Sequence, residues 1–309
     1  MHIAYLLKQY GFKKVKMKIF LITGANGLLG RSMCNKLSQQ SDYVYALTRE
    51  LLLEPIPNVT YIPINFESPW SDQALPTSVD TIIHLAQSVK FRDFPEKAAD
   101  IFGVNIDSTA RLLNYAKNAG AKQFIYASSG GVYEGGSLAL DENSPISPVG
   151  KLGFYLGSKM CSEILVQSYA ALMQVIVIRP FFIYGPGQNR SMLIPRLMDN
   201  IISGNPISLM GKHGIRINPI HVEDAAASIV AALLIKESAT FNIAGPKVMS
   251  IHEICNGIGH YLGKSPVFVN QSGQANDLIA DITSMCVKLR APSIFLLDSL
   301  SDIDTSLRR

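Results

Sequence analysis

The sequence predicts an α/β fold in which a doubly wound parallel sheet is followed by a smaller mixed lobe. The first observation is a strand, a glycine turn and a helix start within residues 18–30. The second is that short apolar runs alternate with helical patterns up to about residue 180, which is typical of parallel strands joined by right-handed crossovers. The third is that this alternation loosens beyond residue 180. Since ligands of such sheets bind beyond the carboxyl ends of the strands, we expect the functional residues there.

The apolar, β-prone residues 19–22 predict a buried first strand. Gly24, Gly27 and Gly30 follow it, and a helical pattern then continues through Leu37. Glycines let the backbone approach a ligand closely, and a helix N-terminus offers free N–H groups and a partial positive charge to a pyrophosphate. A purely structural turn between strand and helix is the alternative. The strand that precedes the glycines favours a Rossmann-type dinucleotide site.

Residues 43–47 predict the second strand, whose end sets the choice of cofactor in a dinucleotide-binding fold. An acidic side chain there bonds the adenosine ribose, whereas an arginine accommodates a 2′-phosphate. Here the strand runs into Thr48-Arg49-Glu50, which places Arg49 close to that position. We therefore expect NAD or NADP as the cofactor, with a lean to NADP. A Glu50 side chain turned inwards would favour NAD instead.

The remaining elements are predicted from the same alternation. Further strands are expected at 59–64, 81–85, 124–127 and 175–179. Helices are expected at 95–118, closed by Gly120, and at 154–171, with a surface loop at 134–153 before the second. In the later part, helices are expected at 191–203, 223–236, 250–262 and 294–307, and short strands near 216–221 and 240–243.

This pattern divides the chain into an NAD(P)-binding domain, residues 17–180, and a smaller substrate-binding lobe, residues 181–309. Part of the later chain can return to the sheet. Residues 1–16 are expected to be a loose N-terminal extension, because Met17 directly precedes the first strand.

Composition excludes several classes of function. The 309 residues are 17% charged and 48% hydrophobic, which indicates a globular protein. The net charge of +4 comes without a long Lys/Arg block, so no nucleic-acid partner is expected. No apolar run is long enough to cross a membrane. The four cysteines form no C-x-x-C pair and the histidines show no metal-ligand spacing, so we expect reduced thiols, a cytoplasmic location and no metal.

Tyr155 and Lys159 are the residues that indicate chemistry. They lie four positions apart in the predicted helix and therefore project from one face. A phenol titrates near ~10, and a nearby ammonium with a positively charged nicotinamide would lower its pKa and let it accept a proton. Ser129, just after a predicted strand, would hold the substrate oxygen by a hydrogen bond. A Tyr/Lys pair on a solvated helix face is the alternative.

These motifs together resemble the extended short-chain dehydrogenases/reductases of the NAD-dependent epimerase/dehydratase family, whose members act mostly on nucleotide sugars. The resemblance covers residues 18 to about 305. It is carried, in the family's order, by Thr-Gly-Ala-Asn-Gly-Leu-Leu-Gly at 23–30, His-Leu-Ala at 84–86, Val-Asn-Ile at 104–106, Tyr-Ala-Ser-Ser-Gly-Gly-Val-Tyr at 126–133, Tyr-Leu-Gly-Ser-Lys at 155–159, Arg-Pro-Phe-Phe-Ile-Tyr-Gly-Pro at 179–186, Ile-His-Val-Glu-Asp at 220–224 and Phe-Asn-Ile-Ala-Gly at 241–245.

The resemblance implies a role for each matching residue. The catalytic residues would be Ser129, Tyr155 and Lys159. The cofactor would contact the glycine turn, the adenine and ribose pockets and the nicotinamide face, namely Gly24, Asn26, Gly27, Leu28, Leu29, Arg49, Asn65, Phe66, Leu85, Ala86, Asn105, Tyr155, Lys159, Pro180 and Ile183. The substrate would contact Gln87, Arg92, Ser129, Gly130, Phe182 and Arg216. The resemblance also implies a homodimer that pairs the helices at 96–118 and 154–171.

Three departures from the family pattern narrow the activity. Gly130 and Gly131 stand where family dehydratases carry an acidic pair, so 4,6-dehydration is not expected. Phe182 stands where many sugar epimerases have an asparagine that bonds the substrate nucleotide. Arg216 resembles the arginine that grips the substrate diphosphate, but its spacing to His221 is one residue longer than expected.

The predicted function is an NAD(P)-dependent epimerase or reductase that acts on a nucleotide sugar by Tyr/Lys/Ser-assisted hydride transfer. One alternative is an NADP-dependent reductase of a simpler carbonyl substrate. An alternative of another class is a dinucleotide-binding regulator without catalysis.

Overall fold

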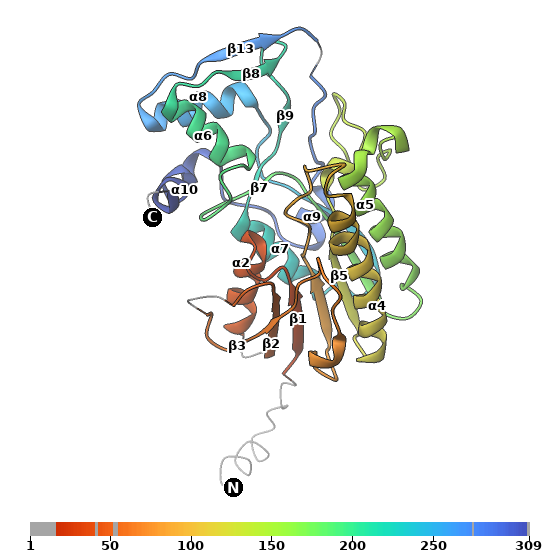
Figure 1. The fold of residues 1–309 in the computed structure, drawn as a ribbon. Coiled ribbons are helices and arrows are strands. Elements are labelled where there is room, and N and C mark those ends of the chain that lie inside the picture. The colour runs from red at the N-terminus through yellow and green to blue at the C-terminus, as the bar shows by residue number, and fades with distance from the viewer. Residues whose placement is uncertain (1–16, 41–42, 52–54, 274, 308–309) are drawn as a thin grey trace.

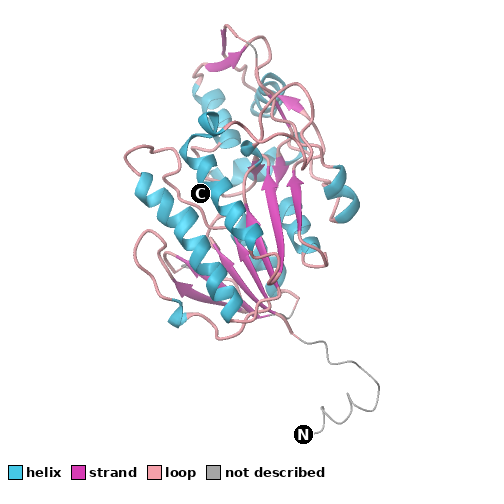
Figure 2. Ribbon diagram, turned by 90° about the vertical axis from the view of Figure 1, so that its right-hand side faces the viewer, coloured by secondary structure: helices cyan, strands magenta, loops and turns pink. Residues whose placement is uncertain are grey.

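A computed structural model describes residues 17–40, 43–51, 55–273 and 275–307. Its centre is a parallel sheet of seven strands in the order β11-β6-β5-β4-β1-β2-β3, and the strands point the same way in Figure 2. Their bounds are β1 (Ile19–Thr23), β2 (Tyr43–Thr48), β3 (Val59–Pro63), β4 (Thr81–His84), β5 (Gln123–Ala127), β6 (Gln174–Pro180) and β11 (Ala239–Ile243). The doubly wound α/β fold predicted from the sequence is confirmed.

The order of the strands reverses at β1. This strand pairs with β2 on one side and with β4 on the other, so that Thr23 lies level with Leu47 and with His84. Ligands of doubly wound sheets bind at such a switch point, beyond the carboxyl ends of the strands. The glycine turn that follows Thr23 lies at this place.

Helices cover both faces of the sheet (Figure 1). Because side chains alternate across a strand, Phe20 and Ile22 of β1 pack into one core layer and Leu21 packs into the other. The first layer includes residues of α2 (Leu28–Ser38), α7 (Val222–Ala232) and α9 (Thr283–Lys288). The second includes residues of α4 (Ser108–Asn118) and α5 (Val149–Ser168).

A smaller lobe lies beyond the carboxyl ends of the strands (Figure 1). It contains α6 (Leu193–Ser203), α8 (Ile251–Leu262) and α10 (Leu300–Leu307), which pack around a separate apolar core. Two strands that the sequence did not predict, β8 (Ile207–Met210) and β13 (Phe268–Gln271), pair in parallel. Two further strand pairs are short: β7 (Ile183–Tyr184) with β10 (Ile220–His221), and β9 (Arg216–Ile217) with β12 (Met249–Ser250).

Four predicted elements need correction. The loop at 134–153 is shorter than expected, since α5 begins at Val149 and contains a kink at Gly153, where φ is 66°. The helix predicted at 95–118 consists of α3 (Ala98–Phe102), a π-helical turn η2 (Gly103–Asp107) and α4. The strand near 216–221 is two strands, because Pro219 between them has no N–H to donate. The helix predicted at 294–307 starts with a 3-10 turn, η4 (Leu297–Ser299).

Two further predictions concern the ends of the predicted domains. The strand expected at 240–243 belongs to the central sheet, where β11 pairs with β6. The predicted loose extension, residues 1–16, lies outside the described residues.

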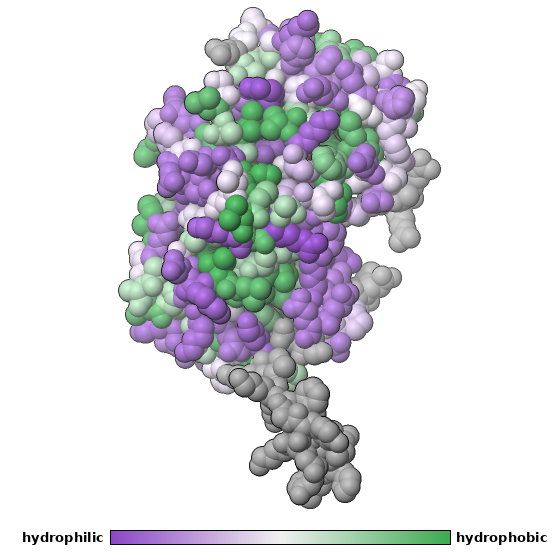
Figure 3. Space-filling view, turned by 180° about the vertical axis from the view of Figure 1, so that it is seen from behind, coloured by the Kyte–Doolittle hydropathy of each residue, from purple (hydrophilic) through white to green (hydrophobic). Residues whose placement is uncertain are grey.

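On the face shown in Figure 3, apolar side chains interrupt a largely hydrophilic surface.

Candidate active site

The glycine turn brings the backbone of β1 against the end of β4. Gly24 has φ +67°, and a Cβ added there would lie 2.9 Å from the backbone nitrogen of Ala86. A Cβ on Gly30 would collide with the carbonyl oxygen of Gly24. The turn is closed by the Gly27 N–H, which donates to the Gly24 carbonyl at 2.9 Å. Only glycine fits Gly24 and Gly30 without a shift of the backbone.

The N-terminus of α2 has the features of a pyrophosphate site. Gly27 is its N-cap, has no side chain, and leaves the first N–H groups of the helix uncapped. These groups and the helix dipole favour an anion. Asn26 donates from Nδ2 to the Glu50 carbonyl at 2.8 Å, and this bond ties the turn to the end of β2. The described residues therefore fit the diphosphate of a dinucleotide, with Leu28 and Leu29 in the first helical turn.

The end of β2 and the loop after β3 form the predicted adenosine side. Arg49 is half-exposed and lies 3.5 Å from the Glu67 carboxylate, which also accepts from Lys90 at 3.0 Å. Asn65 accepts from the Glu67 N–H at 3.0 Å. The Phe66 ring is buried and packs edge-on against Trp70 at 5.1 Å. Arg49 thus stands at the predicted position and is paired with a carboxylate.

Lys159 is buried in α5 beneath the end of β5. Its Nζ donates to the Ala127 carbonyl at 2.9 Å and lies 5.4 Å from the centre of the Tyr126 ring. Burial lowers the pKa of Lys159 to about 7, and the charge of Glu163 acts in the opposite direction. An ammonium has three donors, so two remain for other acceptors.

Tyr155 lies one turn before Lys159 and is partly exposed. Its hydroxyl donates to Oε1 of Gln87 at 2.8 Å, and its ring lies 4.9 Å from that of Phe91. Burial raises the pKa of Tyr155. The Lys159 ammonium bonds the Ala127 carbonyl and not the phenol. The lowered pKa predicted from the sequence needs a positively charged nicotinamide beside the phenol and stays a prediction for the cofactor-bound protein.

Ser129 and the two glycines after it form the end of β5. The Ser129 hydroxyl accepts from the Gly131 N–H at 3.1 Å, which leaves its own proton for another acceptor. A Cβ on Gly130 would strike the ring of Phe181. A Cβ on Gly131 would lie 3.1 Å from Leu156. The structure leaves no room at Gly130 for the acid that a dehydratase would place there.

Asn105 connects the loop after β4 with α5. Its Oδ1 accepts from the Ser88 N–H at 2.9 Å, and its Nδ2 donates to the Ser158 hydroxyl at 2.8 Å. Its carbonyl, in the π-helical turn, accepts from the hydroxyls of Thr109 at 2.6 Å and Ser162 at 2.7 Å. Asn105, in this wider helical turn, therefore makes hydrogen bonds with four other residues.

The sequence analysis did not predict that a buried histidine, His84, links the glycine turn to the helix that follows Asn105. His84 lies 2.6 Å from the Thr23 hydroxyl and 2.9 Å from the Thr109 hydroxyl. The Thr109 hydroxyl donates its proton to the Asn105 carbonyl, so Nε2 of His84 donates to Thr109 and Nδ1 accepts from the Thr23 hydroxyl. The Ala86 N–H also donates to Thr23, at 3.1 Å. Burial, aided by the charge of Lys159, lowers the pKa of His84 to about 3, so the ring stays neutral.

Three of the predicted substrate residues, Arg92, Phe182 and Arg216, lie on separate segments of the chain. Arg92 donates to the Ser191 carbonyl at 3.2 Å and covers the ring of Phe91 at 4.9 Å. Arg216 is half-exposed and is held by Asp277, with 2.8 Å between Nε and Oδ2. Phe182 adopts φ 45°, in the strained left-handed region. Two residues predicted to contact the cofactor lie nearby in the chain: Pro180 ends β6, and Ile183 begins β7.

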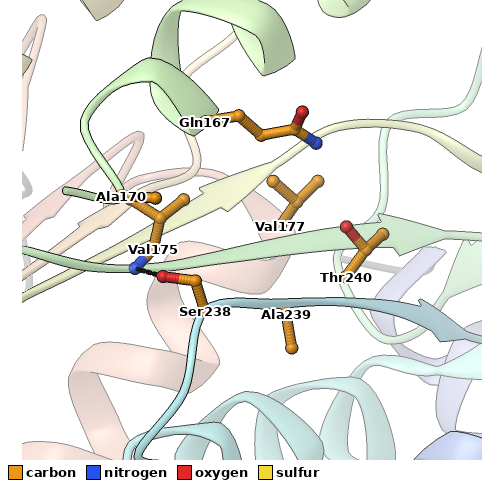
Figure 4. A pocket seen from close by; sticks show the side chains of 7 residues that line it. All are labelled: Gln167, Ala170, Val175, Val177, Ser238, Ala239 and Thr240. Carbon is orange, nitrogen blue, oxygen red and sulfur yellow. Dashed lines mark hydrogen bonds between the residues drawn. The ribbon is translucent and has the colours of Figure 1, made fainter.

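Two hollows lie away from Tyr155. A cavity of about 220 Å³ lies at the edge of the sheet, and none of the residues that line it is titratable. Figure 4 shows them: Gln167, Ala170, Val175, Val177, Ser238, Ala239 and Thr240. Its one drawn hydrogen bond joins the Val175 N–H to the Ser238 hydroxyl at 3.0 Å. A larger hollow of about 470 Å³ in the smaller lobe is lined by residues of α6 and β8, among them Leu193, Arg196, Asn200, Leu209 and Met210.

No group of side chains in the described ranges could hold a metal ion. None of the helices in this part of the chain is long and apolar enough to cross a membrane. The four cysteines are free, and burial raises the pKa of Cys34 and of Cys255 to about 12.

A glycine turn at the switch point, with a Tyr/Lys pair beside it, defines a dinucleotide-dependent enzyme of the extended short-chain dehydrogenase type. The chain belongs to the NAD-dependent epimerase/dehydratase family, whose sequence profile matches residues 20–244.

Similar proteins agree with this assignment. A Bacillus subtilis protein named as an uncharacterized UDP-glucose epimerase, YtcB, is 27% identical over 93% of this chain and 96% of its own. A dTDP-4-dehydro-6-deoxy-D-allose reductase of Streptomyces bikiniensis is 26% identical over 79% of this chain and 81% of its own.

Solved structures share the fold. MoeE5 in complex with UDP-glucuronic acid and NAD superposes with a TM-score of 0.80 at 25% identity, over 94% of this chain and 99% of its own. A UDP-glucuronic acid 4-epimerase of Bacillus cereus reaches a TM-score of 0.82 at 23% identity, with the same two coverages.

Proposed function

We propose that this protein is an NAD(P)-dependent epimerase or reductase that transfers hydride at a carbon of a nucleotide sugar. The observation that carries the proposal is the position of Tyr155 and Lys159. Both are anchored to the carboxyl ends of neighbouring strands, Tyr155 through Gln87 after β4 and Lys159 through Ala127 at the end of β5. Ser129 follows two residues after Ala127, so the three groups face the end of the sheet where the glycine turn lies.

In this mechanism Tyr155 accepts the proton of a substrate hydroxyl, or donates it to a carbonyl oxygen in the reverse direction. Ser129 donates its free proton to the same substrate oxygen. Lys159 would hold the ribose of a bound dinucleotide with its remaining donors, and its charge would lower the pKa of the phenol. The dinucleotide, when bound, takes up or supplies the hydride.

The relatives favour a nucleotide sugar as substrate. The names of two of them refer to UDP-glucose and to a dTDP-sugar, and the MoeE5 structure is a complex with UDP-glucuronic acid. The packing of Phe181 on Gly130 favours epimerisation or reduction over dehydration, since no acid fits there to protonate a departing hydroxyl.

Phe182 and Arg216 support a second candidate, an NADP-dependent reductase of a simpler carbonyl compound. Phe182 offers no amide to a nucleotide base. Three donor groups of Arg216, its backbone N–H, Nε and NH2, already bond Asp277 at 2.7–2.8 Å. Arg49 would then bind the 2′-phosphate in place of the Glu67 carboxylate.

Mass spectrometry of the small molecule released on denaturation tests the proposal. NAD⁺ retained near one per chain supports the epimerase, which keeps its cofactor through each cycle. An empty protein that binds NADPH more tightly than NADH supports a reductase, and Arg49→Ala should then weaken NADPH binding while it spares NADH. A protein that retains and binds neither dinucleotide contradicts the proposal.

The role of Tyr155 is tested with UDP-glucose, UDP-glucuronic acid and dTDP-sugars as substrates. Tyr155→Phe should lower turnover by about 10²–10⁴-fold. Tyr43→Phe is the matched control, because Tyr43 is 54% exposed on β2. Equal activity of the two variants would refute the role of Tyr155.

Two further features follow from the family and stay proposals. We propose a homodimer through α4 and α5, and Ile164 on α5, 61% exposed, offers an apolar contact for it. Light scattering of the wild type and of Ile164→Glu checks this association. A cytoplasmic location remains the expectation and is checked by cell fractionation.

A further inference from the structure

Gln87 anchors Tyr155, and the proposed mechanism gives this side chain no role in proton transfer. Its side-chain Oε1 accepts the hydrogen bond of the Tyr155 hydroxyl at 2.8 Å. Gln87 is exposed and Tyr155 is partly buried. The phenol that is proposed to accept the substrate proton is therefore held by an amide at the surface of the site.

The backbone of Gln87 is fixed on both sides. Before it, the Ala86 N–H donates to the Thr23 hydroxyl at 3.1 Å. After it, the Ser88 N–H donates to Oδ1 of Asn105 at 2.9 Å. Both bonds are buried. The Gln87 side chain thus starts from a backbone position that the fold determines.

The same network fixes Tyr155. Asn105 donates from Nδ2 to the Ser158 hydroxyl at 2.8 Å, and this hydroxyl donates to the Tyr155 carbonyl at 2.6 Å. Together with the bond from Tyr155 to Gln87, these contacts close a ring through Gln87, Ser88, Asn105, Ser158 and Tyr155. These contacts fix the position of the Gln87 amide relative to the Tyr155 phenol.

An amide suits both states of the phenol. It has an acceptor, Oε1, for the neutral hydroxyl and a donor, Nε2, for the phenolate. Rotation of the exposed amide by half a turn exchanges them. A hydrogen bond to an ionised acceptor is roughly twice as strong as one between neutral groups, so on balance the amide favours the phenolate.

We propose that Gln87 is a positioning residue for proton transfer: its amide holds the Tyr155 oxygen in place, accepting from the phenol and, after rotation, donating to the phenolate. The proposal rests on the proposed role of Tyr155. A substrate hydroxyl that approaches Tyr155 takes the place of Gln87 as the partner of the phenol and leaves the amide beside the reacting oxygen.

Other charged or titratable groups surround Tyr155. They are Lys159 one turn along α5, Tyr126 on β5, and Arg92, which lies over the Phe91 ring that contacts Tyr155. All are retained in variants of Gln87, so a change in the titration of Tyr155 between these variants reports the amide.

The test is a ¹³C NMR titration of the full chain labelled at tyrosine Cζ, with and without saturating NAD⁺. Tyr155→Phe assigns the resonance. Without cofactor, Gln87→Leu should move the Tyr155 resonance of the neutral phenol, because it removes the acceptor. With NAD⁺, Gln87→Leu should raise the midpoint of ionisation by about one pH unit, a tenfold change. Gln87→Glu should raise it further, since a carboxylate repels the phenolate.

The control is Gln73→Leu, the same replacement at an exposed position in the 3-10 turn η1 (Asp72–Ala74), which should leave both observables unchanged. The proposal is overturned if Gln87→Leu leaves the neutral resonance in place, or if its midpoint equals or falls below that of the wild type. Neither measurement needs a substrate, and the first needs no cofactor, so a failure of NAD⁺ binding would count against the proposed function alone.

Discussion

Replacement of Glu163 by glutamine tests the buried ion pair between α5, the helix that carries Tyr155 and Lys159, and β6. Glu163 on α5 is 1% exposed and makes two bonds to the Arg179 guanidinium on β6, Nε to Oε1 at 3.1 Å and NH2 to Oε2 at 2.7 Å. Arg179 is 5% exposed and also donates to the Tyr133 hydroxyl at 2.7 Å. Glu163→Gln keeps the size of the side chain and leaves the guanidinium buried without a counter-charge.

Breaking a buried pair by removal of one partner costs about 3–5 kcal/mol. The loss is increased here, since the charge of Glu163 also holds up the pKa of Lys159, which burial lowers to about 7. For a chain of this size, we expect the midpoint of thermal unfolding to fall by about 5–10 °C. The measurement is urea and thermal unfolding of the wild type and the variant at pH 7.5.

The matched control is Glu134→Gln, because Glu134 pairs with Lys151 at 3.1 Å and the two side chains are 46% and 69% exposed. It should change the free energy of unfolding by less than about 0.5 kcal/mol. The double variant Glu163→Leu/Arg179→Met removes both charges and should recover most of the loss. A Glu163→Gln loss below about 1 kcal/mol, or no recovery in the double variant, would refute the reasoning.

Three further outcomes are expected. Lys159→Met should stabilise the fold at pH 7 by at least about 1 kcal/mol and abolish turnover. Because folding lowers the pKa of Lys159 from 10.5 to about 7, the unfolded chain binds more protons than the folded one between these pH values, and the wild type gains stability as the pH rises from about 7 to 10.5. A free energy of unfolding of the wild type that does not change with pH over this range would contradict the prediction. Gly24→Ala should cost about 1–3 kcal/mol and abolish dinucleotide binding, measured by calorimetry, because φ is +67° and Ala86 is too close for a Cβ. Gly130→Asp should lower the unfolding midpoint through collision with Phe181 and yield no dehydrated product by mass spectrometry, whereas Gly136→Asp, which meets nothing within 4 Å, should fold normally.

Local patterns predicted the part of the site that local sequence determines. The strand, the glycine turn and the start of α2 follow one another within 18–30, so composition and spacing suffice. Tyr155 and Lys159 share a face of one helix, which periodicity reveals. The raised pKa of Tyr155 in the protein alone was not predicted, because it depends on the burial of the side chain in the folded protein.

Contacts between distant segments were beyond sequence reasoning. β8 pairs with β13, and about 60 residues separate them, with no turn signal that links the two. Gln87 was predicted to contact substrate, but its bond to Tyr155 spans 68 positions and depends on how the β4 end meets α5. The link that the buried His84 makes between Thr23 and Thr109 was not predicted, because it depends on how β1, β4 and α4 pack together.

The return of the chain to the sheet limits how the substrate specificity of this fold can be exchanged. After α6 and β8, residues 222–243 form α7 and β11, which complete the sheet, before α8 and β13 resume the smaller lobe. Later in the chain, α9 also packs against the sheet before α10 returns to the lobe. A graft of the lobe from a relative must therefore replace three separate segments and keep α7, β11 and α9 between them. A single-segment exchange from residue 181 onwards would also replace β11, the edge strand that pairs with β6, and would leave β6 at the edge of the sheet.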